Sequence, residues 1–168
     1  SVTVMLTSIL IVHSRSSNKQ IIFFREQAVL INTLQRAKSF AVNTFQPTLN
    51  SGAPPEKVCD WGVHFEGSKF ILFREIAAPV CTGPGSYDGP TEAFEAFTLD
   101  PSIAFTNLSF DTGASNLSSL DVMFVPPQPV VAFSDPTAGE ARIELGIIGS
   151  SARRATLIVG KGGQVSIE

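Results

Sequence analysis

Residues 21–45 read IIFFREQAVLINTLQRAKSFAVNTF, and they follow an apolar opening, SVTVMLTSILIV, at residues 1–12. The first proline of the chain is Pro47 and the first glycine is Gly52. Since proline and glycine are the residues that most often end a helix, nothing before them interrupts one. The sequence therefore predicts a single N-terminal helix over residues 1–46. At about 1.5 Å per residue it would be a rod of about 65 Å, longer than a small domain can cover.

The second half of this helix is amphipathic. Phe23, Leu30, Leu34, Ala37 and Ala41 recur at the spacing of one helical stripe. The polar residues are expected largely on the other faces of the helix: Arg25, Glu26, Gln35, Arg36 and Lys38. Two alanines in the stripe allow a close approach, so we expect this half to lie against a sheet.

The first half is apolar and has two interpretations. As a helix, residues 1–12 would span about 18 Å, short of the roughly 30 Å of a bilayer core. They also lack the basic start and the small-residue cleavage site of a secretory signal. One interpretation is an ordinary buried helix or strand. The other is the remainder of a longer membrane helix, with residues 13–19 as a polar collar at the interface.

Beyond the loop at residues 46–57 the pattern becomes β-like. Strands are expected at residues 58–65, 69–75, 95–99, 103–110, 121–125, 130–133, 141–145, 155–159 and 164–167. Glycine-containing turns make hairpins of the first two and the last two strands. The sequence thus predicts an α+β fold in which the long helix, residues 1–46, packs on an antiparallel sheet or β-sandwich head, residues 47–168.

Composition limits the class of protein. The chain has 168 residues, enough for one domain with a core in addition to the stalk. Hydrophobic residues make up 43% and charged residues 16%, and the formal net charge is −3. A negative chain gives no general reason to expect nucleic acid or anionic lipid as the main partner.

Three segments carry a resemblance to a known family. They are the apolar-to-amphipathic helix ending RAKSFA (residues 36–41), VCDWGVHFEGSKFILFRE (residues 58–75) and RRATLIVGKGGQVSIE (residues 153–168). Together they resemble a type IV pilin-like protein, closest to the H-type pseudopilins and related minor pilins. The family's cleaved leader, the phenylalanine that follows it and the glutamate in its apolar segment are absent from this sequence. We therefore expect the chain to begin inside the mature protein.

The resemblance implies a structural role and no enzymatic activity or cofactor. Subunits would wait in the cytoplasmic membrane and then assemble with identical or related pilin subunits into an extracellular or periplasm-spanning helical filament. Apolar helices would stay buried in both environments. The filament-core side chains expected from this role are Val2, Val4, Met5, Leu6, Ile9, Leu10, Ile11 and Val12.

Two alternatives remain open. A DNA-binding minor pilin of an uptake system would use Arg153, Arg154 and Lys161 to contact phosphates. A membrane-tethered β-sandwich adhesin would bind a glycan through Trp61 or Tyr87.

Cys59 and Cys81 are the two cysteines of the chain. In an exported protein we expect them to form a disulfide around the first hairpin, the alternative being two free buried thiols. Cys59 and His64 do not indicate a thiol nucleophile with its base, because in an alternating strand they would point to opposite faces. His64 is expected at the edge of a sheet.

No metal site is expected. A two-cysteine site lacks further ligands at suitable spacing. Four carboxylates near the long loop could offer oxygen ligands to calcium, but their spacing favours solvated loop charges: Asp88, Glu92, Glu95 and Asp100. The glycines of residues 160–163 precede a strand, so we expect a hairpin turn there and not a phosphate-binding loop.

Overall fold

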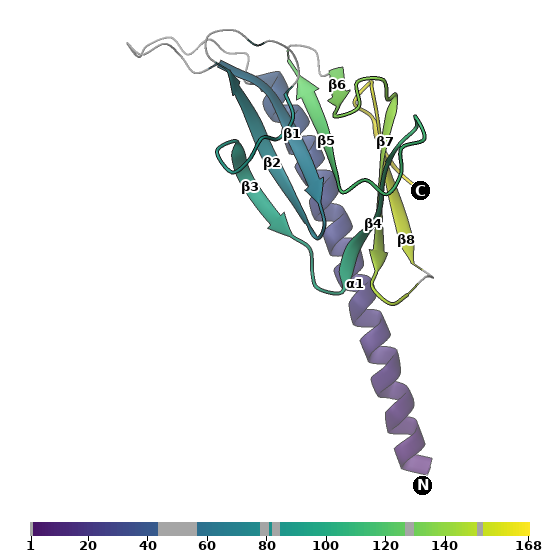
Figure 1. The fold of residues 1–168 in the computed structure, drawn as a ribbon. Helices are drawn as coiled ribbons and strands as arrows, with labels where there is room; N and C mark the ends of the chain where they lie inside the picture. Colours follow the sequence, from purple (N-terminus) through teal and green to yellow (C-terminus); the bar gives the residue numbers. More distant parts are fainter. Residues whose placement is uncertain (1, 44–56, 78–80, 82–84, 127–129, 151–152) are drawn as a thin grey trace.

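The protein, described here from a computed structural model, has an α+β fold with one N-terminal helix packed on antiparallel sheets (Figure 1). The structure describes residues 2–43, 57–77, 81, 85–126, 130–150 and 153–168. The helix is α1 (Val2–Asn43). The strands are β1 (Lys57–Glu66), β2 (Lys69–Ala77), β3 (Ala93–Thr98), β4 (Ile103–Phe110), β5 (Ser119–Val125), β6 (Val130–Phe133), β7 (Glu140–Ile147), β8 (Arg154–Gly160) and β9 (Val165–Ile167).

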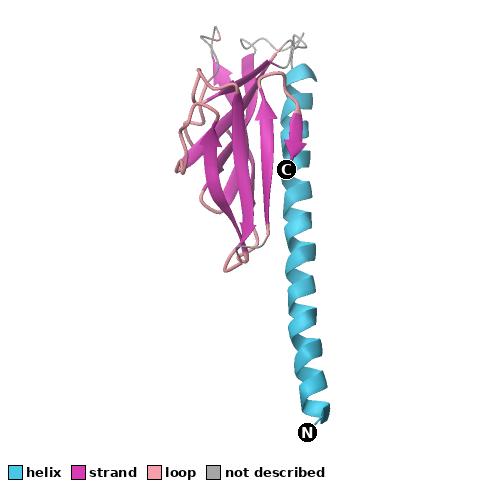
Figure 2. Cartoon of the chain, turned by 90° about the vertical axis from the view of Figure 1, so that its right-hand side faces the viewer, coloured by secondary structure: helices cyan, strands magenta, loops and turns pink. Residues whose placement is uncertain are grey.

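The predicted stripe of α1 is buried. Phe23, Leu30, Leu34, Ala37 and Ala41 are each no more than 5% exposed, and this half of the helix packs mainly on β1. The N-terminal part of the 42-residue helix extends beyond the strands (Figures 1 and 2). The side chains of residues 2–17, which include all eight expected filament-core residues, lie outside the described part of the structure.

One expectation for α1 is wrong. Glu26 is buried and not on a solvent-facing side, and Gln27 and Thr33 are buried with it. These positions lie three or four residues from Phe23 and Leu30, so helical geometry places them on the same stripe. Arg25 Nη2 pairs with Glu26 Oε1 at 2.6 Å and balances the charge, while Thr33 Oγ1 donates to its own helix.

The strands form two antiparallel sheets. The first has the order β3-β2-β1-β5-β6 and the second the order β4-β7-β8-β9. Both predicted hairpins are confirmed: Gly67 (φ 58°) turns between β1 and β2, and Gly163 (φ 74°) lies in the turn between β8 and β9. At these two positions the left-handed backbone favours glycine.

The helix and both sheets share one apolar core. Phe65 and Phe70 contribute to it from the β1–β2 hairpin, Phe124 from β5, and Ile143 and Leu145 from β7. Alternation along β1 sends Trp61, Val63 and Phe65 into this core. The residues between them therefore face the other side of the sheet, which we call the outer face.

Candidate functional site

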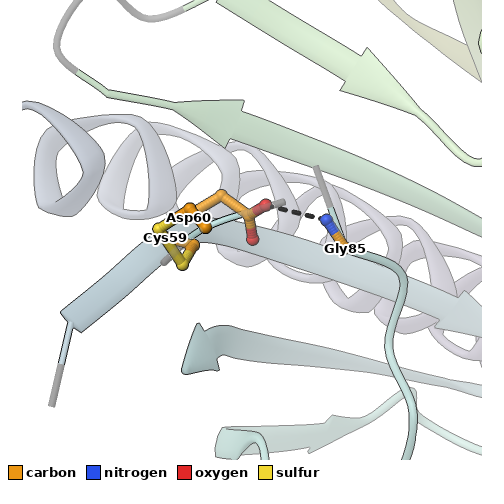
Figure 3. Close-up of a disulfide and its surroundings, with 4 residues drawn as sticks. Cys59, Asp60 and Gly85 are labelled. Carbon is orange, nitrogen blue, oxygen red and sulfur yellow. Dashed lines mark hydrogen bonds between the residues drawn. A yellow bond between two sulfur atoms is a disulfide. The ribbon is translucent and has the colours of Figure 1, made fainter. Parts of the chain in front are cut away.

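A disulfide joins the start of β1 to Cys81, which follows β2 in the chain. Cys59 and Cys81 are bonded with their Cα atoms 5.5 Å apart, across a sequence separation of 22 (Figure 3). The predicted pairing is present, and neither cysteine is free to act as a thiol nucleophile. Cys81 is thereby held near the start of β1.

Two carboxyl groups meet beside this disulfide. The β1–β2 register skips at Cys59, so that Asp60 pairs directly with Glu75. Gly85 N donates to Asp60 Oδ2 at 3.0 Å (Figure 3). A Cβ on Gly85 would lie 2.6 Å from the Glu75 carboxyl, so glycine permits this close approach. Asp60 Oδ1 and Glu75 Oε2 are buried without a hydrogen-bond partner among the described residues.

The surroundings favour the protonated form of both acids. Burial raises the pKa of Asp60 to about 6; the Gly85 hydrogen bond opposes this rise, and the charge of Glu92 adds to it. Burial, followed by the nearby Glu92, raises the pKa of Glu75 to about 7. Like charges close together disfavour the ionised form, so the Glu92 carboxylate acts in the same direction as burial on Glu75. Asp88 N also donates to Glu92 Oε2, at 2.8 Å.

A histidine–aspartate pair lies on the same outer face. His64 Nδ1 is 2.6 Å from Asp121 Oδ1, across the register of β1 and β5, and both residues are less than 9% exposed. An ionised carboxylate only accepts, so Nδ1 of His64 is the donor. The Tyr87 ring lies 4.6 Å from the imidazole. The expected edge position of His64 is wrong, because β1 is the central strand of its sheet.

This arrangement does not form a catalytic triad in the described part of the chain. Both cysteines are bonded to each other, and no described serine or threonine side chain is hydrogen-bonded to His64. The other ring nitrogen, Nε2, lies 3.8 Å from Glu66 Oε2. In the described part of the chain, the outer face therefore carries two polar pairs, Asp60 with Glu75 and His64 with Asp121, and Tyr87 packs over the second.

Three of the four carboxylates near the long loop accept hydrogen bonds or pair with cations, and the fourth residue, Asp88, bonds to Glu92 through its backbone N. Glu95 Oε2 pairs with Arg36 Nη2 at 2.6 Å, and Asp100 accepts from Ser102 N and Oγ. Glu92 accepts from Asp88 N. Among the described residues no group of three His, Cys, Asp or Glu side chains is arranged to hold a metal ion.

The three basic residues proposed for DNA are not brought together. Arg153 and Arg154 lie at the start of β8, and Lys161 follows its last residue. A strand of 7 residues separates them by about 20 Å. Arg154 Nη1 pairs with Glu144 Oε1 at 2.9 Å, and Lys161 Nζ donates to Pro136 O at 3.4 Å. Arg153 is exposed.

The two aromatic residues considered for a glycan differ in position. Trp61 is only 6% exposed and packs between Phe40 and Phe94, with ring centroids 4.8 Å and 5.1 Å away. It therefore has no open ring face of the kind on which a sugar stacks. Tyr87 is half-buried over His64 and Phe73.

Large apolar side chains remain exposed on α1. Ile21 is 67% exposed and Phe24 is 60% exposed, on either side of buried Phe23. We call these two residues the apolar edge of α1. In the described part of the chain, no helix has a stretch that is both long enough and apolar enough to cross a membrane.

Comparisons with protein-family models, with curated proteins and with solved structures give no match to this chain.

Proposed function

We propose that this chain is the structural subunit of a type IV pilus-like filament, assembled through α1. The observation that carries the proposal is the helix itself. Its C-terminal half is built into the head through Leu30, Leu34 and Ala37, while its N-terminal part extends past the strands (Figure 2). A projecting helix of this kind favours association with other helices, because water is a poor environment for its apolar residues.

The apolar edge of α1 supports assembly. Ile21 and Phe24 lie where the helix leaves the head, and burying such a side chain stabilises a contact by about 1.5–3 kcal/mol. Packing this edge against a neighbouring subunit would continue the apolar sequence of residues 1–12. The head, which we propose to be a β-sandwich made by the two sheets, would then face outward.

The membrane stage of the proposal rests on the resemblance to the pilin-like family. Before assembly the subunit would reside in the cytoplasmic membrane, and after it on the cell surface. The apolar sequence at residues 1–12 supports this order of events, since the same side chains can be buried by lipid and then by neighbouring helices.

The geometry favours this role over the two alternatives. A DNA-binding surface would gather its cations, whereas Lys161 lies at the opposite end of β8 from Arg153. A glycan site at Trp61 would need an exposed ring, whereas Phe40 and Phe94 cover it.

Paired charge substitutions test the proposal. Ile21→Glu with Phe24→Glu places two carboxylates on the apolar edge, and we expect filaments sheared from the native cells to lose the chain. Val130→Glu with Ile167→Glu changes two comparably exposed apolar residues of the head and serves as the control. Urea unfolding of each purified variant checks that both still fold. Normal filaments from the helix variant would contradict assembly through α1.

A further inference from the structure

We propose that a groove beside the point where α1 leaves the head binds the headgroup of an anionic phospholipid. This inference rests on the proposed function, because the groove would bind lipid while the subunit resides in the membrane before assembly. The groove has a volume of about 400 Å³. Lys19 and Gln20 of α1 form one wall, and Ile148, Ser150 and Arg153 from the connection between β7 and β8 form the other.

The groove lies at the end of the head from which the N-terminal part of α1 projects. The β7–β8 connection is there beside the link between β3 and β4, since Ile148 N donates to Ser102 O at 2.8 Å. That link in turn meets the β1–β2 turn, where Leu99 N donates to Ser68 O. The N-terminal part of α1 continues past this end (Figures 1 and 2). In a membrane-resident subunit, this is the end that faces the bilayer.

Other cations near this end already have partners. They pair as Arg25 with Glu26 at 2.6 Å, Lys69 with Glu66 at 3.0 Å and Arg154 with Glu144 at 2.9 Å. Lys19 and Arg153 pair with no carboxylate among the residues that the structure describes, and both are exposed. The groove therefore holds two cations whose charge is left for an external anion.

The height of the groove along the helix matches a headgroup layer. From Val12, the last residue of the apolar opening, to Lys19 the helix rises about 10 Å. The polar region on each side of a bilayer core is about 5–8 Å thick. Because helical side chains lean toward the N-terminus, Lys19 extends back toward that layer. Ile148, which is 56% exposed, lies on the same side of the head and adds an apolar contact at the interface.

The chemistry suits a phosphate in a lipid better than one in a nucleic acid. Arg153 can present two parallel N–H groups to one phosphate, and Lys19 supplies a point charge beside it. Two cations in one small groove contact a single phosphate and do not form the longer track that a DNA backbone needs. The net charge of −3 also disfavours a polyanion in general while leaving this local contact intact.

Vesicle flotation of the whole chain tests the inference. Vesicles of phosphatidylcholine alone are compared with vesicles that also contain phosphatidylglycerol. Each cation near an anionic surface strengthens binding about fivefold, so we expect Lys19→Gln with Arg153→Gln to remove about a 25-fold preference for phosphatidylglycerol. Arg142→Gln with Lys161→Gln, toward the opposite end of β7 and β8, removes the same number of positive charges and should keep that preference.

The outcomes separate the inference from the function on which it rests. Flotation on both vesicle types without a preference for phosphatidylglycerol would overturn the headgroup site and leave membrane residence intact. Equal loss of the phosphatidylglycerol preference in both double variants would also overturn the headgroup site, because it would show a general effect of charge. If the Lys19→Gln, Arg153→Gln double variant lost binding to duplex DNA and kept its lipid preference, the groove would be a nucleic-acid-binding site and not a lipid site. No flotation on either vesicle would instead contradict the membrane stage itself.

Discussion

Asp60 and Glu75 face each other across β1 and β2 with fewer hydrogen-bond donors than two carboxylates need. Gly85 N donates to Asp60, and protonation at low pH removes the negative charge of both groups. At higher pH, charges of the same sign are held directly opposite each other, which destabilises a strand pair. The nearby Glu92 and Asp88 add to that repulsion.

We therefore predict that the protein becomes less stable as the pH rises from 5 to 8. The folded-state pKa values, about 6 for Asp60 and about 7 for Glu75, lie above the ordinary values of 3.8 and 4.5. The stability that these groups contribute is fully present at pH values below their ordinary pKa values. It is lost as the pH rises through their folded-state pKa values. Each group contributes at most about 1.4 kcal/mol per pH unit, and less where water reaches it.

Urea unfolding across this pH range measures the effect. Glu75→Gln should flatten the pH dependence and raise the free energy of unfolding at pH 8. Glu140→Gln, which alters an exposed ion pair with Arg142, should leave the pH dependence unchanged. An unchanged slope in the Glu75 variant would show that this carboxyl is not protonated in the folded state.

The His64–Asp121 pair supports a second prediction. Asp121→Ala leaves the buried Nδ1 donor of His64 without its acceptor, and we expect the free energy of unfolding to fall by about 1–3 kcal/mol. Asp121→Asn keeps an oxygen acceptor and should lower the free energy of unfolding by clearly less. Equal costs for the two variants, measured by urea unfolding at pH 7, would mean that the hydrogen bond contributes nothing.

At the scale of elements, the disulfide and α1 hold the head together. Removing the Cys59–Cys81 bond by replacing both residues with serine should lower the free energy of unfolding by about 3 kcal/mol. The amides of Gly85 and Asp88 should then exchange hydrogen faster, while those inside β1 stay protected. Uniform acceleration of exchange across the head would contradict a local effect on the loop.

The buried stripe of α1 gives a stability prediction of its own. Leu34 is fully buried against the head, so Leu34→Ala should lower the free energy of unfolding by about 2–5 kcal/mol. Ile21→Ala, on the exposed apolar edge, should change it by less than about 0.5 kcal/mol. Similar costs at both positions would mean that α1 packs on the head through a different face.

Local patterns predicted the elements well, and contacts distant in sequence were missed. The α1 stripe and both terminal hairpins follow from spacing and from glycine turns, which a linear sequence displays. The burial of Glu26 was not predicted, because a charged residue is expected to face solvent unless a charged partner is known to lie beside it. Here that partner is Arg25. The His64–Asp121 contact joins residues 57 apart, and its register depends on how β1 pairs with β5.

The cross-strand pairing of Asp60 with Glu75 could not be predicted from strand alternation either. The register skips one residue at Cys59, which changes the residue that lies opposite Glu75. The skip lies beside the Cys59–Cys81 bond and the Gly85 hydrogen bond to Asp60, and both contacts join residues distant in sequence.

At the scale of the whole molecule, two surfaces lie where the helix leaves the head, and a third lies on the first sheet. The first two are the apolar edge of α1 and the groove lined by Lys19 and Arg153, and the third is the outer face, where Tyr87 packs over His64. In the proposed order of events, the groove would meet the bilayer before assembly and the apolar edge would meet a neighbouring subunit after it.

Helical reconstruction of filaments sheared from the native cells, by electron microscopy at a resolution that traces side chains, tests assembly through α1 most directly. We predict that α1 helices are bundled along the filament axis, with Ile21 and Phe24 buried against a neighbouring subunit and the heads outside. Filaments without this chain, or filaments in which α1 faces solvent, would contradict the account.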